Sequence, residues 1–137
     1  MRILILIVIS FLALTTKPQE TCRSGNRCSF IKELRRYCKY PIKQQEKNKE
    51  AFVGIEYKVD DKGYITKKRT VICDDSKFKK VTLKAFDEVK YKAIGVAGRT
   101  DTIYFQYKIQ GSSTSINPLA DIIVIGYGSC NVPVLMK

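Results

Sequence analysis

Strict alternation of apolar and polar side chains fixes the middle of this 137-residue chain as β-structure. From Val53 to Val59 every second residue is apolar, which places the apolar side chains on one face of a strand. The segment Asp60–Gly63 follows with turn-forming residues and a glycine where a positive φ is expected. The segment Tyr64–Cys73 then supplies the returning arm. The sequence therefore predicts a half-buried β-hairpin.

Helical spacing appears on both sides of this hairpin. Ser29 is placed to cap a helix that ends at Tyr40-Pro41, because the residue before a proline is disfavoured in the helical region. A second helix with one apolar stripe is predicted over 76–89, and alternation returns over Thr100–Ile109 as a third strand. The order helix, strand, strand, helix, strand predicts an α+β domain in which two helices pack on a three-stranded antiparallel sheet.

The C-terminal part differs in composition from this domain. Residues 110–118 contain a Gly-Ser-Ser-Thr-Ser run that predicts a flexible linker, and 119–137 begin with the β-branched, nearly uncharged segment Leu119–Gly128. This tail predicts an additional C-terminal strand. Of the 25 basic and 13 acidic residues, 22 and 12 lie within residues 20–109, so the positive charge belongs to the folded domain.

The N-terminus resembles an export signal. Arg2 precedes the apolar run Ile3–Leu14, which is too short for a membrane-spanning helix and is followed by polar residues and Pro18. We expect residues 1–19 to be a signal peptide and the domain at 22–109 to be periplasmic or secreted; an uncleaved inner-membrane anchor facing the periplasm is the alternative. Export would expose five cysteines to oxidation, among which Cys22 and Cys28 are the easiest pair to close although the connectivity stays open. The five are Cys22, Cys28, Cys38, Cys73 and Cys130.

Missing residue types limit the chemistry. The chain has no histidine, which excludes Ser-His-Asp and Cys-His catalysis and most zinc sites, and it has no CxxC pair. The segment Gly95–Gly98 has neither the length nor the context of a phosphate-binding loop. Asp87 and Glu88 are neighbours on a helix and point about 100° apart, which does not suit two acids acting on one bond. We expect no enzyme, no metal and no cofactor.

Basic side chains suggest one function in a different class. A cationic patch with nearby aromatic residues would bind an anionic surface such as lipopolysaccharide or nucleic acid. Its members are Lys67, Lys68, Arg69, Lys77, Lys79, Lys80, Tyr64, Phe78 and Tyr91. The same lysines are also typical of a solvated periplasmic surface, and the leading interpretation expects no nucleic-acid partner.

Taken in order, these motifs resemble the C-terminal periplasmic domain of TonB energy transducers in its Bacteroidetes-like form. The resemblance covers about Phe30 to Ile109. It is carried by Lys39-Tyr40-Pro41, Val53–Val59, Asp60–Gly63 with Ile65-Thr66, Val81–Val89 and Tyr104–Ile109.

This resemblance implies a domain that binds a short extended segment, the TonB box, of an outer-membrane receptor. Binding would occur by strand addition, and the energy would come from an inner-membrane proton-channel complex reached through another subunit. By position, Thr100–Ile109 carries the edge strand, with Tyr104, Gln106 and Lys108 as outward-facing contacts. The alternative is that these three are ordinary solvent-facing residues.

A second resemblance concerns the tail. Asp121–Gly128 is similar to the segment that opens the plug of starch-utilisation-type TonB-dependent receptors, where it serves as the box. We expect the tail to add to the domain's own sheet, or to that of a second copy in a homodimer, and to compete with receptor; the alternative is a core strand or a substitute for a third helix. The residues expected to bind are Ile122, Ile123, Val124, Ile125 and Tyr127.

The chain also departs from a complete transducer. It has no full-length membrane anchor and no Pro-rich spacer, and Tyr91-Lys92-Ala93 stands where the family has Trp and Pro. Ala51 replaces a common glycine. These differences put coupling to the proton-motive force in doubt and favour a divergent or stand-alone relative.

Overall fold

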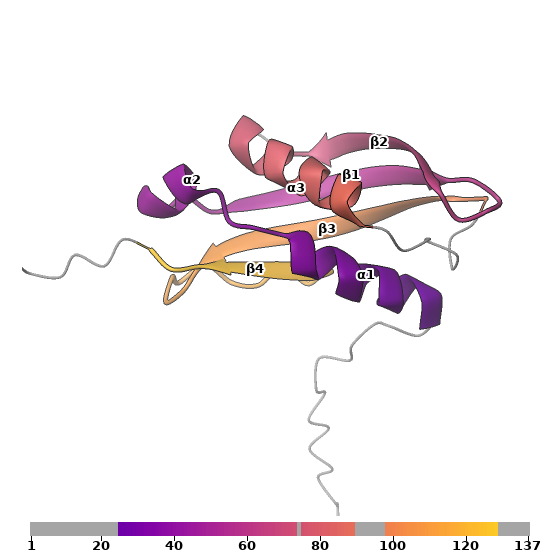
Figure 1. Ribbon diagram of the computed structural model, residues 1–137. Helices are drawn as coiled ribbons and strands as arrows, with labels where there is room; N and C mark the ends of the chain where they lie inside the picture. The colour runs from indigo at the N-terminus through magenta and orange to yellow at the C-terminus, as the bar shows by residue number, and fades with distance from the viewer. Residues whose placement is uncertain (1–24, 74, 90–97, 129–137) are drawn as a thin grey trace, which may run out of the picture.

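The computed structural model describes residues 25–73, 75–89 and 98–128 of the chain (Figure 1). The predicted signal peptide at 1–19, together with Cys22, Tyr91 and Cys130, lies outside the described residues. The elements are α1 (Gly25–Tyr37), α2 (Ile42–Glu46), β1 (Ala51–Val59), β2 (Ile65–Ile72), α3 (Ser76–Glu88), β3 (Thr100–Ile109) and β4 (Ile122–Gly126). Within the described part, no helix has the length and apolarity needed to cross a membrane.

The strands form one mixed sheet in the order β2-β1-β3-β4. Strand β1 pairs antiparallel with both β2 and β3, as the hairpin and the alternation predicted. The extra C-terminal strand is also present, and it pairs parallel with β3. The α+β prediction is therefore confirmed, whereas the three-stranded antiparallel sheet is enlarged to four strands of mixed direction.

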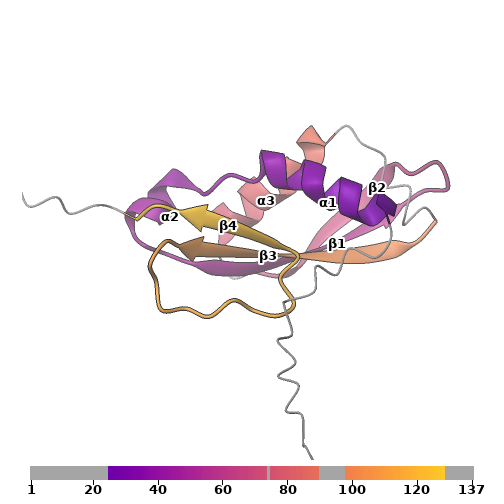
Figure 2. The same cartoon turned by 90° about the horizontal axis from the view of Figure 1, so that it is seen from below.

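Helices α1 and α3 lie on one face of the sheet (Figures 1 and 2). Phe30 and Leu34 of α1 and Phe78 and Phe86 of α3 are almost fully buried, which matches the apolar stripes seen in the sequence. Their rings meet the sheet directly, since the ring centroids of Phe86 and Phe105 are 6.0 Å apart. The core is a single layer of apolar side chains between two helices and one sheet face.

Short polar contacts set the boundaries of the central elements. In the hairpin turn, the Asp60 carboxylate accepts from the backbone N–H of Lys62 at 2.9 Å and of Tyr64 at 2.8 Å, while Gly63 has a φ of 90°. At the start of α3, the Asp75 carboxylate accepts from the backbone N–H of Lys77 at 2.8 Å. Asp60 therefore acts as a turn residue, as the sequence predicted, and Asp75 acts as the N-cap of α3.

The connection from β3 to β4 crosses the sheet face opposite the helices (Figure 2). A parallel pair needs such a crossover, and here an irregular segment provides it in place of a helix. Gln106 ties the segment down: its amide nitrogen donates to the Ser115 carbonyl at 2.9 Å, and its amide oxygen accepts from the Asn117 N–H at 2.7 Å. The predicted linker is thus hydrogen-bonded to the sheet.

Candidate binding site along β3

Strand β3 is an interior strand. The prediction that Thr100–Ile109 forms a free edge is wrong for Phe105–Ile109, because β4 pairs with the outer side of those residues. The tail takes this position because its β-branched side chains bury there: Ile122 is 0% exposed and Val124 is 9% exposed. Any chain that adds to this side of β3 must therefore take the place of β4.

The three predicted contact residues share the sheet face opposite the helices. The Tyr104 ring stacks on Phe52, with centroids 5.6 Å apart and the ring planes 3° from parallel. Gln106 is only 6% exposed under the crossover, and the Lys108 ammonium donates to the carbonyl and hydroxyl oxygens of Ser112 at 3.0 and 2.8 Å. The structure therefore brings Tyr104, Gln106 and Lys108 together but engages them with the protein's own chain. Their role in binding a partner stays a prediction.

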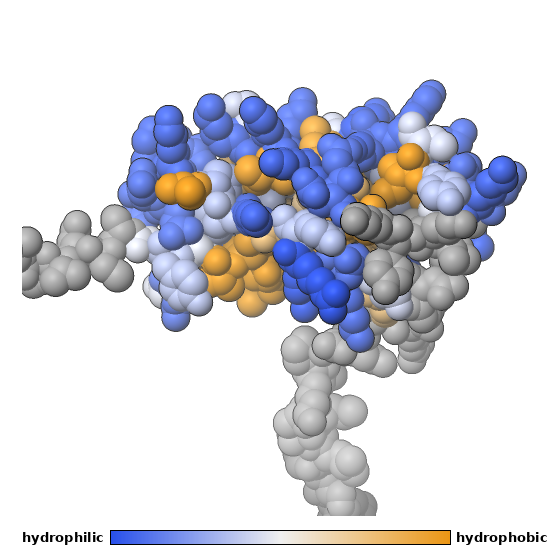
Figure 3. Space-filling model, viewed as in Figure 1, coloured by the Kyte–Doolittle hydropathy of each residue, from blue (hydrophilic) through white to orange (hydrophobic). Residues whose placement is uncertain are grey.

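The predicted tail residues separate into two sets. Ile122 and Val124 point into the core, whereas Ile125 is 45% exposed and Tyr127 is 68% exposed. Ile123 is half-buried between them. Apolar surface gathers over β4 and contrasts with the polar surface around it (Figure 3). One face of β4 thus completes the core and the other remains available for contact.

Arg27 of α1 anchors the beginning of β4. Its guanidinium binds Asp101 with Nε 2.8 Å from Oδ2 and binds Asp121 with Nη1 3.2 Å from Oδ1. The other carboxylate oxygen of Asp121 accepts from the Tyr104 N–H at 3.0 Å. Burial alone would lower the pKa of Arg27, but the bond to Asp101 and the charge of Asp121 raise the pKa above its ordinary value. The guanidinium therefore stays charged between two carboxylates.

Tyr40 closes the other end of β4. Its ring lies so near Gly126 that a Cβ atom on that glycine would be 2.7 Å from Cδ2 of the ring. The ring is held edge-on against Phe78 and Tyr107, at centroid distances of 5.5 and 5.6 Å, and its hydroxyl donates to the Lys49 carbonyl. Burial, with a smaller contribution from Glu50, raises the pKa of Tyr40 to about 12. Sequence reasoning identified the Tyr40-Pro41 helix end but did not predict this contact.

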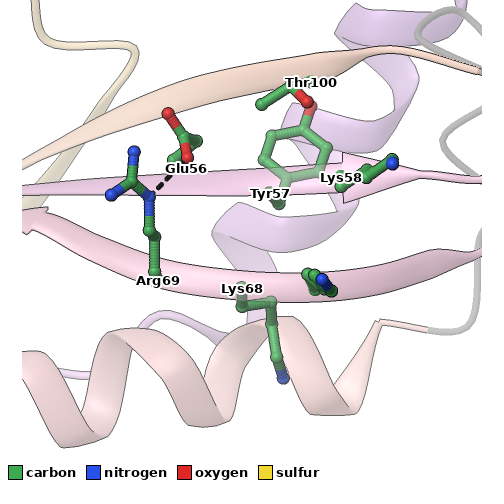
Figure 4. A pocket seen from close by; sticks show the side chains of 7 residues that line it. Glu56, Tyr57, Lys58, Lys68, Arg69 and Thr100 are labelled. Carbon is green, nitrogen blue, oxygen red and sulfur yellow. Dashed lines mark hydrogen bonds and ion pairs between the residues drawn. The ribbon is translucent and has the colours of Figure 1, made fainter.

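A shallow basic hollow lies on the same sheet face, towards the hairpin turn (Figure 4). Its volume is about 340 Å³. It is lined by Glu56, Tyr57, Lys58, Lys67, Lys68, Arg69 and Thr100. Lys58 and Lys67 stand directly opposite each other across β1 and β2, and Arg69 binds Glu56 with Nε 2.5 Å from Oε1.

The predicted cationic patch needs correction. Phe78 is 0% exposed, so this ring belongs to the core and cannot contact an anionic surface. Lys67 shares the open sheet face with Lys58, whereas Lys68 turns towards Asp87 on α3. The α3 lysines lie on the helix side of the sheet. The basic residues are therefore divided between two faces.

Two described cysteines bear on the expected oxidation. Cys28 is disulfide-bonded, and Cys22, which the sequence suggested as its partner, lies outside the described residues. The Cys38 thiol donates to the Leu34 carbonyl at 3.3 Å, and burial raises its pKa to about 12. Among the residues that the structure describes, no three Cys, Asp or Glu side chains gather as metal ligands.

Comparison with known proteins adds no relative. No family model, no curated protein and no solved structure matches the chain.

Proposed function

We propose that this protein is a non-enzymatic, TonB-like periplasmic domain that binds an extended segment of TonB-dependent outer-membrane receptors by strand addition. In this role it would serve energy-coupled transport, with the inner-membrane proton-channel complex reached through another subunit. The observation that carries the proposal is the parallel pairing of β4 with β3 over Phe105–Ile109. The chain's own box-like segment, Asp121–Gly128, occupies this position.

Backbone pairing explains why this side of β3 suits an extended ligand. The N–H and C=O groups of an outer strand pair with any extended chain, while pockets for alternate side chains provide the selectivity. Ile122 and Val124 fill such pockets from β4. A receptor segment with apolar residues at the same alternation would fill them equally well.

Occupation by β4 makes the binding competitive. The tail is joined to β3 through the short crossover 110–121, so its effective concentration at the site is about millimolar. A receptor segment must displace β4. The apparent affinity of that segment is its intrinsic affinity multiplied by the fraction of molecules in which β4 leaves the site open. This arrangement supports the predicted competition between tail and receptor.

An amide-shift titration tests the proposal. The uniformly labelled full chain is titrated with a peptide that copies residues 121–128 and, as the control, with a peptide of the same composition in scrambled order. We expect shifts at Phe105–Ile109 and Ile122–Gly126 with the first peptide alone. If neither strand responds while Lys58 and Lys67 do, strand addition at β3 is wrong.

The basic hollow favours one second candidate, the binding of an anionic surface. Lys58 and Lys67 are opposed in the sheet, where like charges repel each other unless an anion lies between them. Binding of this kind weakens steeply with salt because phosphate contacts release counterions, whereas backbone pairing does not. Affinity for lipopolysaccharide at two salt concentrations, measured for the native protein and for Lys67→Gln, separates this function from strand addition.

A further inference from the structure

We infer that the site occupied by β4 selects its ligand by two sequence marks, an aspartate at the first position and a glycine at the sixth, with apolar residues at the second and fourth. These positions correspond to Asp121, Gly126, Ile122 and Val124. The inference rests on the proposed function and specifies which receptor segments the domain would accept. Arg27 would recognise the aspartate, and Tyr40 would select the glycine.

The first mark is read by two donors that belong to different parts of the fold. Arg27 approaches one carboxylate oxygen of Asp121 to 3.2 Å, and the Tyr104 N–H donates to the other at 3.0 Å. The Asp121 N–H in turn donates to the Tyr104 carbonyl at 2.9 Å. The residue at this position therefore binds both the N–H and the C=O group of Tyr104, and it sets the register of β4 against β3.

Arg27 is also held by residues outside β4. Its Nε donates to Asp101 at 2.8 Å, and its Nη2 donates to the Thr102 carbonyl at 3.3 Å. The Asp101 carboxylate also accepts from the Tyr57 hydroxyl at 2.9 Å. A donor fixed in this way loses little conformational entropy on binding, so a carboxylate at the first position is favoured over a neutral amide.

At the sixth position the Tyr40 ring sterically excludes side chains larger than that of glycine. A Cβ atom at Gly126 would stand 2.7, 2.8 and 2.9 Å from three carbons of the Tyr40 ring. The ring cannot turn away easily, because Phe78 and Tyr107 pack against it edge-on and Lys49 holds its hydroxyl. Even alanine would force the strand or the ring to move, so this site accepts glycine alone without distortion.

The positions between the two marks differ in what they allow. Ile122 is 0% exposed and Val124 is 9% exposed, so the second and fourth positions need apolar side chains of similar volume. The fifth position, Ile125, is 45% exposed and the third is half-buried, so these tolerate substitution. A shift of register by one residue would exchange the two sets and is therefore excluded.

Peptide discrimination by the full chain tests these marks. Gly126→Ala in the protein weakens its own β4 and retains the Arg27 and Tyr40 side chains, which opens the site to labelled peptides that copy residues 121–128. Four peptides are compared by fluorescence anisotropy: the parent sequence, one with Asn in place of Asp121, one with Ala in place of Gly126, and a control with Thr in place of Ile123. We expect each of the two mark peptides to bind about tenfold more weakly than the parent and the control to bind within about twofold.

A second protein variant assigns the first mark to Arg27. In Arg27→Gln combined with Gly126→Ala, the preference for Asp over Asn should fall below about twofold while the preference for Gly over Ala persists. Loss of both preferences together would assign the effect to general damage and overturn the role of Arg27.

The two marks can also be tested in the protein's own β4, by amide hydrogen exchange. Asp121→Asn and Gly126→Ala should each speed amide hydrogen exchange at Ile122–Gly126, whereas Ile123→Thr should leave it unchanged. If all four peptides bind equally at β3, the marks are wrong although strand addition stands. If no peptide binds and exchange is unaltered, the marks and the proposed function are both wrong.

Discussion

Replacing Ile122 by alanine measures whether β4 is part of the core. The side chain is 0% exposed, and the substitution removes three carbon atoms from it. At about 0.8 kcal/mol for each buried carbon, the lost transfer free energy is about 2.4 kcal/mol. The cavity left behind adds to this loss, so we expect the free energy of unfolding to fall by about 3 to 4 kcal/mol.

Urea denaturation provides the measurement. Far-UV circular dichroism and tyrosine fluorescence can follow it, because the chain has eight tyrosines and no tryptophan. Ile125→Ala is the matched control: the same chemical change in the same strand at a side chain that is 45% exposed, with an expected loss below about 1 kcal/mol. A smaller m-value for Ile122→Ala would indicate that β4 has detached from the sheet before unfolding. Equal losses for the two variants, or a loss below about 1 kcal/mol for Ile122→Ala, would refute the placement of β4 in the core.

Three further predictions concern buried and exposed polar groups. Burial raises the pKa of Tyr40 from its ordinary 10 to about 12 and raises the pKa of Tyr107 as well. The stability that the two tyrosines contribute should therefore be complete below pH 10 and be lost as the pH rises through 12. Phenolate absorbance should increase together with unfolding, and titration near pH 10 without unfolding would contradict this. Burial raises the pKa of the Cys38 thiol to about 12, so iodoacetamide should alkylate it far more slowly in the native protein than in urea, as peptide mapping would show; equal rates would contradict its burial. Arg69→Ala should leave the urea midpoint unchanged, because Arg69 and its partner Glu56 form an exposed pair; a clear shift would mean that this pair supports the hairpin.

Local features of the fold were predictable from the sequence. The alternation over Val53–Val59, the Asp60 turn and the apolar stripe of α3 each depend on residues close together along the chain, and the structure confirms them. Phe78 shows the limit of composition: the lysines around it suggest a place in the basic patch, but its position in the apolar stripe of α3 decides that it is buried.

The candidate binding site was harder to predict because its contacts are distant in the sequence. The contact between Arg27 and Asp121 joins residues 94 positions apart, and no local pattern indicates it. The β-branched run of the tail predicted a strand, but propensity does not determine which strand it joins or in which direction. The glycine of that run was visible, whereas the tyrosine ring that requires it became apparent only in three dimensions.

The two edge strands of the sheet, β2 and β4, differ in their capacity to pair with a strand of a neighbouring molecule. Strand β2 carries Lys67 and Arg69, and its register against β1 is irregular at two places, which are features that prevent edge-to-edge pairing. Strand β4 is short, uncharged and regular in its pairing. Growth of the sheet across molecules requires two edge strands that can pair on every copy, and of the two edge strands that the structure describes only β4 has these features. Contact between copies through the sheet would therefore close at a symmetric pair and could not continue into a fibre.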